Sequence, residues 1–220
     1  MRPRAAVLIA ALLATVAACA PTSPVDVRLS IPASSPFPPG SLAAILVTDF
    51  HDQAPLPDFE TGRALGDQLA AELARAAKGK IGRIGRARVP IVAGRDDPAA
   101  WKAAGEREKP GTVFLAGTVS LTAKILKAVD KAQPDDGPFD LAGRVLVSKR
   151  RWTLAADVRV ISAATGEALY QRTFLEERDY NELDKPAEFA FHELSERVRT
   201  KLFQALLGTA TPETRTLLRR

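Results

Sequence analysis

Cysteine and histidine are scarce in this sequence: the 220 residues include one cysteine, Cys19, and two histidines, His51 and His192. One cysteine cannot form a disulfide within the chain, and it cannot supply the thiolates of a structural zinc site. The sequence therefore excludes small disulfide-stapled folds and cysteine zinc modules. With 46% hydrophobic and 26% charged residues, the composition is that of one folded domain, or at most two.

Long apolar runs are also missing, and the most apolar one, at 5–18, is too short to span a bilayer as a stable helix. Two arginines precede it and small residues end it, which is the order of a secretory signal. The string Val16-Ala-Ala-Cys19 resembles the bacterial lipobox, in which the cysteine is acylated and becomes the first residue of the mature protein. We therefore predict a signal peptide at 1–18 and a lipid anchor at Cys19. An ordinary signal peptide and a short membrane anchor are the alternatives.

The residue after the cysteine bears on the choice of membrane. Ala20 stands where a lipoprotein retained in the inner membrane would usually carry Asp, by resemblance to enterobacterial sorting. We therefore expect the mature protein at the periplasmic face of the outer membrane.

An excess of charge of one sign is small in this chain. The formal net charge is +5, from 31 basic and 26 acidic residues. Removal of the predicted signal peptide leaves 29 basic residues against the same 26 acidic ones, so the net charge falls to +3. A nucleic-acid-binding protein would concentrate basic residues on one face, and this balance gives no support for one.

Proline is concentrated in one segment, at 20–40, which has six prolines and little apolar periodicity. We predict that residues 19–40 form the lipidated cysteine and an extended tether. An alternative for part of it is an edge strand of the domain at 25–31, where Val25, Val27, Leu29 and Ile31 alternate with polar residues. The folded domain is predicted at 41–208, and the weakly patterned residues 209–220 form a C-terminal tail.

The periodicity of residues 41–208 predicts strands and helices in an order typical of an α/β fold. Short apolar or alternating segments predict strands at 42–50, 81–92, 112–127, 143–162 and 167–177. Helical spacing predicts helices at 60–78, 97–107 and 186–207, the last with a buried stripe made of Phe189, Leu194, Val198, Leu202 and Leu206. We therefore expect a single α/β sandwich of two or three layers, with helices packed on a mixed sheet.

Several short strings resemble the superfamily that contains the curli-secretion lipoprotein CsgG and the penicillin-binding-protein activator LpoB. They are Ile45-Leu-Val-Thr-Asp-Phe50, Phe114-Leu-Ala-Gly-Thr118 and the strand at 154–170 that runs through a Thr-Gly-Glu turn, and the similarity covers roughly 42–207. The resemblance implies an α/β core of non-enzymatic envelope proteins that bind partners. In one branch of the superfamily the subunits oligomerise into a pore.

A pore needs two membrane-inserted hairpins from each subunit, with apolar side chains at alternate positions. The only room for them is at 121–157, a region rich in lysine, arginine and aspartate. One hairpin, from 119–125 and 141–147, fits there, and a second does not. The favoured interpretation of this region is a solvated hairpin with a polar tip at 134–138, which is a candidate site of partner contact.

Residues suited to catalysis are sparse. His51 lies beside Asp49 and Asp52, which permits a metal or general-base cluster, although a solvated loop is the favoured interpretation. The glycines of 79–85 match neither nucleotide-binding fingerprint, and a helix end followed by a strand explains them better than a phosphate loop. We therefore expect no enzyme activity, no cofactor and no metal, with a hydrolase that uses His51 as the least favoured function.

Two places offer aromatic residues next to charge. Lys149, Arg150, Arg151 and Trp152 put three cations beside an indole, which suits contact with anionic headgroups or a glycan polymer. Because strand residues alternate between faces, Trp152 in the core and Arg151 in water is the favoured alternative. Tyr180 is a second candidate contact, or a turn aromatic.

The predicted function is a scaffold or regulator of an envelope assembly, in cell-wall synthesis or secretion, with a secretion-channel subunit as the alternative.

Overall fold

The computed structural model describes residues 24–31, 35–38, 40–89, 97–131, 144–208 and 211–218. The chain divides into two compact units, one formed by Met1–Ala33 with Ala210–Arg220 and the other by Ser34–Thr209. The predicted signal peptide, Cys19 and the polar tip at 134–138 lie outside the described residues.

The first unit contains a two-stranded antiparallel sheet made by β1 (Pro24–Ile31) and β8 (Thr211–Leu218). Pro24 pairs with Leu218 at one end, and Ile31 pairs with Thr211 at the other. The alternation at 25–31 therefore marks a strand, but this strand pairs with the C-terminal segment and is not an edge of the larger sheet. The sequence predicts a tether and a tail for these two segments. It misses their pairing because a local pattern does not show that two segments far apart in sequence pair with each other.

The second unit is built on a six-stranded mixed sheet, which confirms the predicted α/β fold class. The strand order is β4-β2-β5-β6-β7, and the short β3 pairs with β5. β2 runs parallel to both β4 and β5, whereas β5, β6 and β7 are antiparallel. The strands are β2 (Ala44–Val47), β3 (His51–Asp52), β4 (Arg83–Arg86), β5 (Thr112–Lys131), β6 (Arg144–Ser162) and β7 (Ala168–Tyr180).

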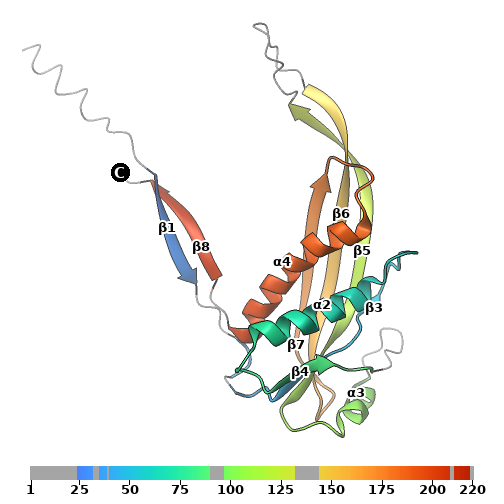
Figure 1. Ribbon diagram of the computed structural model, residues 1–220, viewed down its shortest axis with the longest axis vertical. Coiled ribbons are helices and arrows are strands. Elements are labelled where there is room, and N and C mark those ends of the chain that lie inside the picture. The colour runs from blue at the N-terminus through green and yellow to red at the C-terminus, as the bar shows by residue number, and fades with distance from the viewer. Residues whose placement is uncertain are drawn as a thin grey trace, which may run out of the picture. The chain divides into compact units, whose positions relative to one another are not determined.

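Two helices, α2 (Thr61–Ala76) and α4 (Ala187–Leu207), cover one face of this sheet (Figure 1). Leucines at helical spacing make the buried side of each helix, and they pack against alternate residues of β5 and β6 such as Leu121 and Leu154. The short helix α3 (Pro98–Gly105) lies on the opposite face, where Trp101 packs on Phe114 with the ring centroids 5.5 Å apart.

Single residues of known capping chemistry mark the ends of two helices. The Asp97 carboxylate caps α3 by accepting a hydrogen bond from the Ala99 N–H at 2.9 Å, and Gly208 ends α4 with a φ of 60°. The glycines of 79–85 likewise follow the end of α2 and lead into β4, as the favoured interpretation held. Phe189 does not belong to the buried stripe of α4, because its side chain is exposed.

β5 and β6 continue well past the rest of the sheet. Their pairing runs without a register shift from Val113 opposite Ser162 to Lys131 opposite Arg144. β7 ends earlier, with Tyr180 opposite Arg150. Beyond that row the two strands form a ribbon that extends past α4, seen at the top of Figure 1. We call this ribbon, together with Ile125 on the row at its base, the arm: residues 125–131 of β5 and 144–149 of β6.

Among the residues that the structure describes, no helix is both long enough and apolar enough to cross a membrane.

Candidate functional site

The arm exposes three large apolar side chains on one face. Ile125 is 59% exposed, Val129 61% and Leu146 66%. Val129 lies directly opposite Leu146, and residues paired across antiparallel strands share a face. Ile125 and Leu121 are on the same face, since each lies an even number of residues from Val129 along the strand. The arm therefore prolongs the apolar face that α2 and α4 cover in the rest of the sheet, but without that cover.

A row of aromatic and basic residues closes the core at the base of the arm. Trp152 and Tyr180 are buried there. The Arg150 guanidinium lies 5.9 Å from the centroid of the Trp152 ring, and its Nη1 donates to the backbone carbonyl of Lys185 at 3.5 Å. The Tyr180 ring packs edge-on against Phe189, with centroids 6.2 Å apart. These contacts separate the dry core from the exposed ribbon.

The predicted contact residues do not form a single surface. Trp152 enters the core, as the favoured interpretation held, and Arg150 lies over it on the same face. Lys149 and Arg151 lie on the opposite face of the sheet, because alternate strand residues point to opposite sides. Contact of a partner with Lys149, Arg150, Arg151, Trp152 and Tyr180 stays a prediction, and the burial of Trp152 and Tyr180 restricts direct contact to the cations.

The sequence predicts contacts at the base of the arm, but it did not single out the three exposed apolar residues of the arm itself. A signal for them was present, since Leu121, Ile125 and Val129 all fall at odd positions of one strand. Apolar residues thus continue along the core-facing side of β5 beyond the part of the strand that α2 and α4 cover.

Charged pairs fix the base of the arm. Arg151 forms a two-point ion pair with Asp179, with Nε–Oδ1 at 2.6 Å and Nη2–Oδ2 at 2.9 Å, and it also contacts Glu177. The hydrogen bond from Arg151 holds the pKa of the Asp179 carboxyl below its ordinary value, and the same bond raises the pKa of Arg151. Both charges of this pair are therefore used within the chain.

A second network joins β7 to α4. The Tyr180 hydroxyl donates to the Glu193 carboxylate at 2.5 Å, and Arg178 forms an ion pair with Glu193 at 3.1 Å. Burial raises the pKa of the Tyr180 phenol, and the neighbouring Glu193 raises it further. Tyr180 thus stays protonated at physiological pH and acts as a fixed donor between the sheet and the helix.

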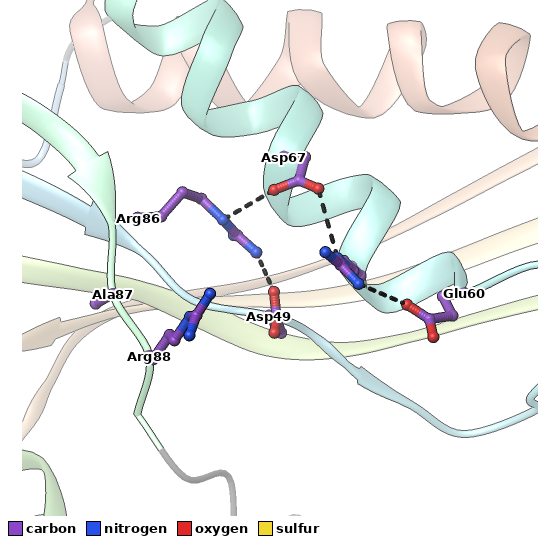
Figure 2. Close-up of a pocket in the computed structure, with 7 residues that line it drawn as sticks. Asp49, Glu60, Asp67, Arg86, Ala87 and Arg88 are labelled. Carbon is purple, nitrogen blue, oxygen red and sulfur yellow. Dashed lines mark hydrogen bonds and ion pairs between the residues drawn. The ribbon is translucent and has the colours of Figure 1, made fainter.

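A hollow of about 430 Å³ lies where β2 and β4 end, beside the start of α2 (Figure 2). Arg86 is its centre: the guanidinium donates to the Thr48 carbonyl at 2.7 Å, pairs with Asp67 at 3.1 Å and also pairs with Asp49. A Cβ on Gly66 would lie 2.2 Å from Arg86 Nη1, so glycine leaves the room that the arginine needs. Arg86 thus pairs with two carboxylates, and it links β2, β4 and α2.

His51 lies in a different hollow, of about 470 Å³, on the other face of the sheet with Thr118 and Asp157. Asp49 is engaged with Arg86, and the Asp52 carboxylate accepts a hydrogen bond from the Ala54 N–H at 3.1 Å. The cluster considered for His51, Asp49 and Asp52 is therefore not assembled. In the described part of the chain, no group of three or more His, Cys, Asp or Glu side chains could hold a metal ion.

The usual ligand crevice of an open α/β sheet coincides here with the Arg86 hollow. Such sheets bind ligands outside the carboxyl ends of neighbouring parallel strands, where the connections leave toward opposite faces. Here that point lies between the parallel neighbours β2 and β4, since β2 leads on to α2 and β4 leads on to α3, and these two helices are on opposite faces. Arg86 pairs there with Asp49 and Asp67, so its charge is used within the chain. The arm is therefore the candidate functional site.

The fold and this site define a single α/β domain with a mixed sheet and a projecting two-stranded arm. No family model matches the chain, and no curated protein matches it.

Among solved structures, the chain is similar to the PelC dodecamer from Paraburkholderia phytofirmans, at 14% identity and a TM-score of 0.39, over 80% of this chain and 95% of that one. It is also similar to lipoprotein GNA1162 from Neisseria meningitidis, at 13% identity and a TM-score of 0.36, over 74% and 99% of the two chains. A third similar structure is the hypothetical protein CT253 from Chlamydia trachomatis, at 9% identity and a TM-score of 0.43, over 74% and 96%. The solved structures that resemble this chain thus include a bacterial lipoprotein.

Proposed function

We propose that this chain is a lipoprotein anchored at Cys19 in the outer membrane, facing the periplasm, that works without catalysis as a scaffold or regulator of an envelope assembly. The lipobox string before Cys19 supports the anchor. The resemblance to the CsgG and LpoB superfamily supports a role in binding, in cell-wall synthesis or in secretion.

The observation that carries the binding role is the uncovered apolar face of the arm. Burial of one Val, Leu or Ile side chain contributes roughly 1.5–3 kcal/mol. Ile125, Val129 and Leu146 receive little of that contribution on folding, because they remain in water. A protein that covers them would gain it on binding, and exposed apolar residues gathered on one face are typical of interaction sites.

Site-specific photo-crosslinking in intact cells tests this role. A photoreactive phenylalanine in place of Leu146 is expected to give one recurring adduct with another envelope protein. The matched control carries the same group in place of Leu175, a leucine of β7 that is 62% exposed, against 66% for Leu146. Equal adducts from both positions, or none from Leu146, would count against the arm as a docking site.

The anchor has a separate test. Metabolic labelling with an acyl probe is expected to mark the wild-type chain and to be lost in Cys19→Ser. Label that persists in the variant would contradict lipidation at this cysteine.

A subunit of a CsgG-like secretion channel is the second candidate, favoured by the length of the β5–β6 hairpin outside the sheet. Within the described residues this is one hairpin, whereas the family pore uses two from each subunit. A discrete ring of chains in detergent extracts, with Leu146 crosslinked only to copies of the same chain, would support the channel over the scaffold.

A further inference from the structure

The outer edge of β5 is only partly used by the sheet. On this side β5 pairs with β2 near its start and then with β3 at Thr118 and Val119. The last backbone hydrogen bond runs from the Gln53 N–H to the Val119 carbonyl at 2.8 Å. Within the described residues no strand pairs with this edge beyond Val119, although β5 continues to Lys131.

The hydrogen bonds of the paired part show which backbone groups point outward. The carbonyls of Gly111, Leu115 and Val119 accept bonds from the segments on the outer side, whereas the carbonyl of Thr112 accepts from Ala163 on the β6 side. Odd-numbered residues therefore direct their backbone groups outward. Because the pairing with β6 has no register shift, this alternation continues. The residues whose outward donors and acceptors pair with no strand in the described part of the chain are Leu121, Ala123, Ile125, Lys127 and Val129.

The side chains along this edge select what could pair with it. Ile125 and Val129 are exposed on the face that continues the core. Lys124 and Lys127 are exposed too, and neither has an ion-pair partner among the residues that the structure describes. Arg150, directly opposite Ile125, has no carboxylate partner there either. The edge thus combines unpaired backbone groups, alternating apolar side chains and uncompensated positive charge.

We propose that the partner binds by adding one strand to the outer edge of β5 over residues 121–129, through an extended acidic segment with apolar side chains at every second position. Backbone hydrogen bonds along an exposed edge provide affinity in this mode, and alternate side chains provide specificity. This inference rests on the proposed binding function and states how the partner is recognised. The apolar side chains of the added strand cover Ile125 and Val129, and the carboxylates on its other face pair with Lys124.

Charge complementarity favours an acidic segment over a second copy of this chain. Antiparallel pairing of two β5 edges would bring Lys124 and Lys127 of one copy close to the same lysines of the other. Like charges opposite each other destabilise strand pairs, whereas opposite charges stabilise them.

A proline scan can separate the edge from the rest of the arm. Lys127→Pro removes an outward N–H and leaves the bonds to β6, which use the even-numbered residues. Lys127→Ala is the matched control, since it removes the same charge but keeps the N–H. Ala123→Pro is a second variant of the first kind, in case Lys127→Pro changes the fold, which circular dichroism and melting would show.

The probe is a synthetic peptide of about ten residues, the length of an ordinary strand, in which valine and glutamate alternate. Its binding to the full chain in detergent is measured by fluorescence anisotropy. We expect each proline variant to lose affinity about tenfold or more, and Lys127→Ala to lose less, since one blocked edge position removes hydrogen bonds on both sides of it. A peptide with lysine in place of glutamate is expected to bind far more weakly than the acidic one.

Two results would overturn the proposal. The first is equal binding of the acidic peptide to wild type and to both proline variants. The second is no peptide binding together with concentration-dependent self-association that the proline variants abolish, which would assign the edge to a second copy. The crosslink from Leu146 is measured separately, so a partner that binds the arm without using the edge would still be detected.

Discussion

The same two strands, β5 and β6, lie in two different environments along their length. In the body of the domain, α2 and α4 cover one face, and Leu121 and Leu154 are completely buried. In the arm the same face continues in the same register, yet Val129 and Leu146 are mostly exposed. The contrast shows that β5 and β6 keep their pairing and their side-chain alternation beyond the part that α2 and α4 cover. Only in the covered part does burial of the apolar side chains stabilise the fold.

The difference assigns the two regions to different tasks. An isolated two-stranded ribbon is at best marginally stable in water, so the arm depends on the body for its order. The body gains little from the arm, because the apolar side chains of the arm remain in water. Residues in the body are therefore constrained by folding, whereas residues in the arm are free to be used for binding.

The largest expected effect comes from equal truncations in the two regions. Leu154→Ala removes a fully buried side chain and is expected to lower the free energy of unfolding by about 2–5 kcal/mol, from lost burial and the cavity left behind. Leu146→Ala makes the same change on the arm and is expected to stay within about 0.5 kcal/mol of wild type. Urea unfolding followed by circular dichroism measures both.

A comparable loss of stability in the two variants would break the comparison, since it would mean that Leu146 is covered in the folded chain. For partner binding, the proposed function predicts the opposite ranking of the two variants. With the photoreactive group placed at Val129, Leu146→Ala is expected to reduce the crosslink to the envelope protein. Leu154→Ala is expected to leave this crosslink unchanged in the molecules that remain folded.

A smaller effect is expected where β5 and β6 approach closely within the body. Gly117 has a φ of 157°, and a Cβ there would lie 1.8 Å from the carbonyl oxygen of Asp157 on β6. Gly117→Ala is expected to cost about 1–3 kcal/mol, because the strained backbone and the clash both oppose the pairing. Gly85→Ala in β4 is the control, since its Cβ would meet nothing closer than 3.9 Å. Equal melting temperatures for the two variants would contradict the close approach.

Much of the body could be predicted from the sequence, because local signals and tertiary structure agree there. The leucines of α2, the cap at Asp97 and the end of α4 at Gly208 each follow from spacing or from the chemistry of one residue. They required no knowledge of which elements become neighbours.

The remaining features depend on contacts that no local pattern contains. The sequence favoured a tether at 19–40, with a strand at 25–31 only as an alternative, and only the fold shows that this strand forms and pairs with β8. His51, Asp49 and Asp52 are neighbours in sequence, yet β3 and Arg86 draw them toward different faces and partners. The exposure of the arm follows from where β7 ends and α4 begins, and hydrophobic periodicity alone cannot distinguish a covered face from an uncovered one.

The smallest expected effect lies at the boundary between body and arm, in the ion pair of Arg151 with Asp179. The pKa of Asp179 is below its ordinary value of 3.8 because Arg151 donates to the carboxylate. A lowered folded-state pKa means that the pair contributes stability above about pH 4 and loses it as the pH falls through the lower value. Both side chains are more than one third exposed, so the contribution is small.

Asp179→Asn is therefore expected to flatten the acid limb of a stability–pH curve slightly, measured by urea unfolding between about pH 7 and pH 2. Asp58→Asn changes an exposed carboxyl that has no ion pair among the described residues, and it serves as the control. Acid limbs of the same shape in the two variants would show that the base of the arm is held by the burial of Trp152 and Tyr180, and not by this pair.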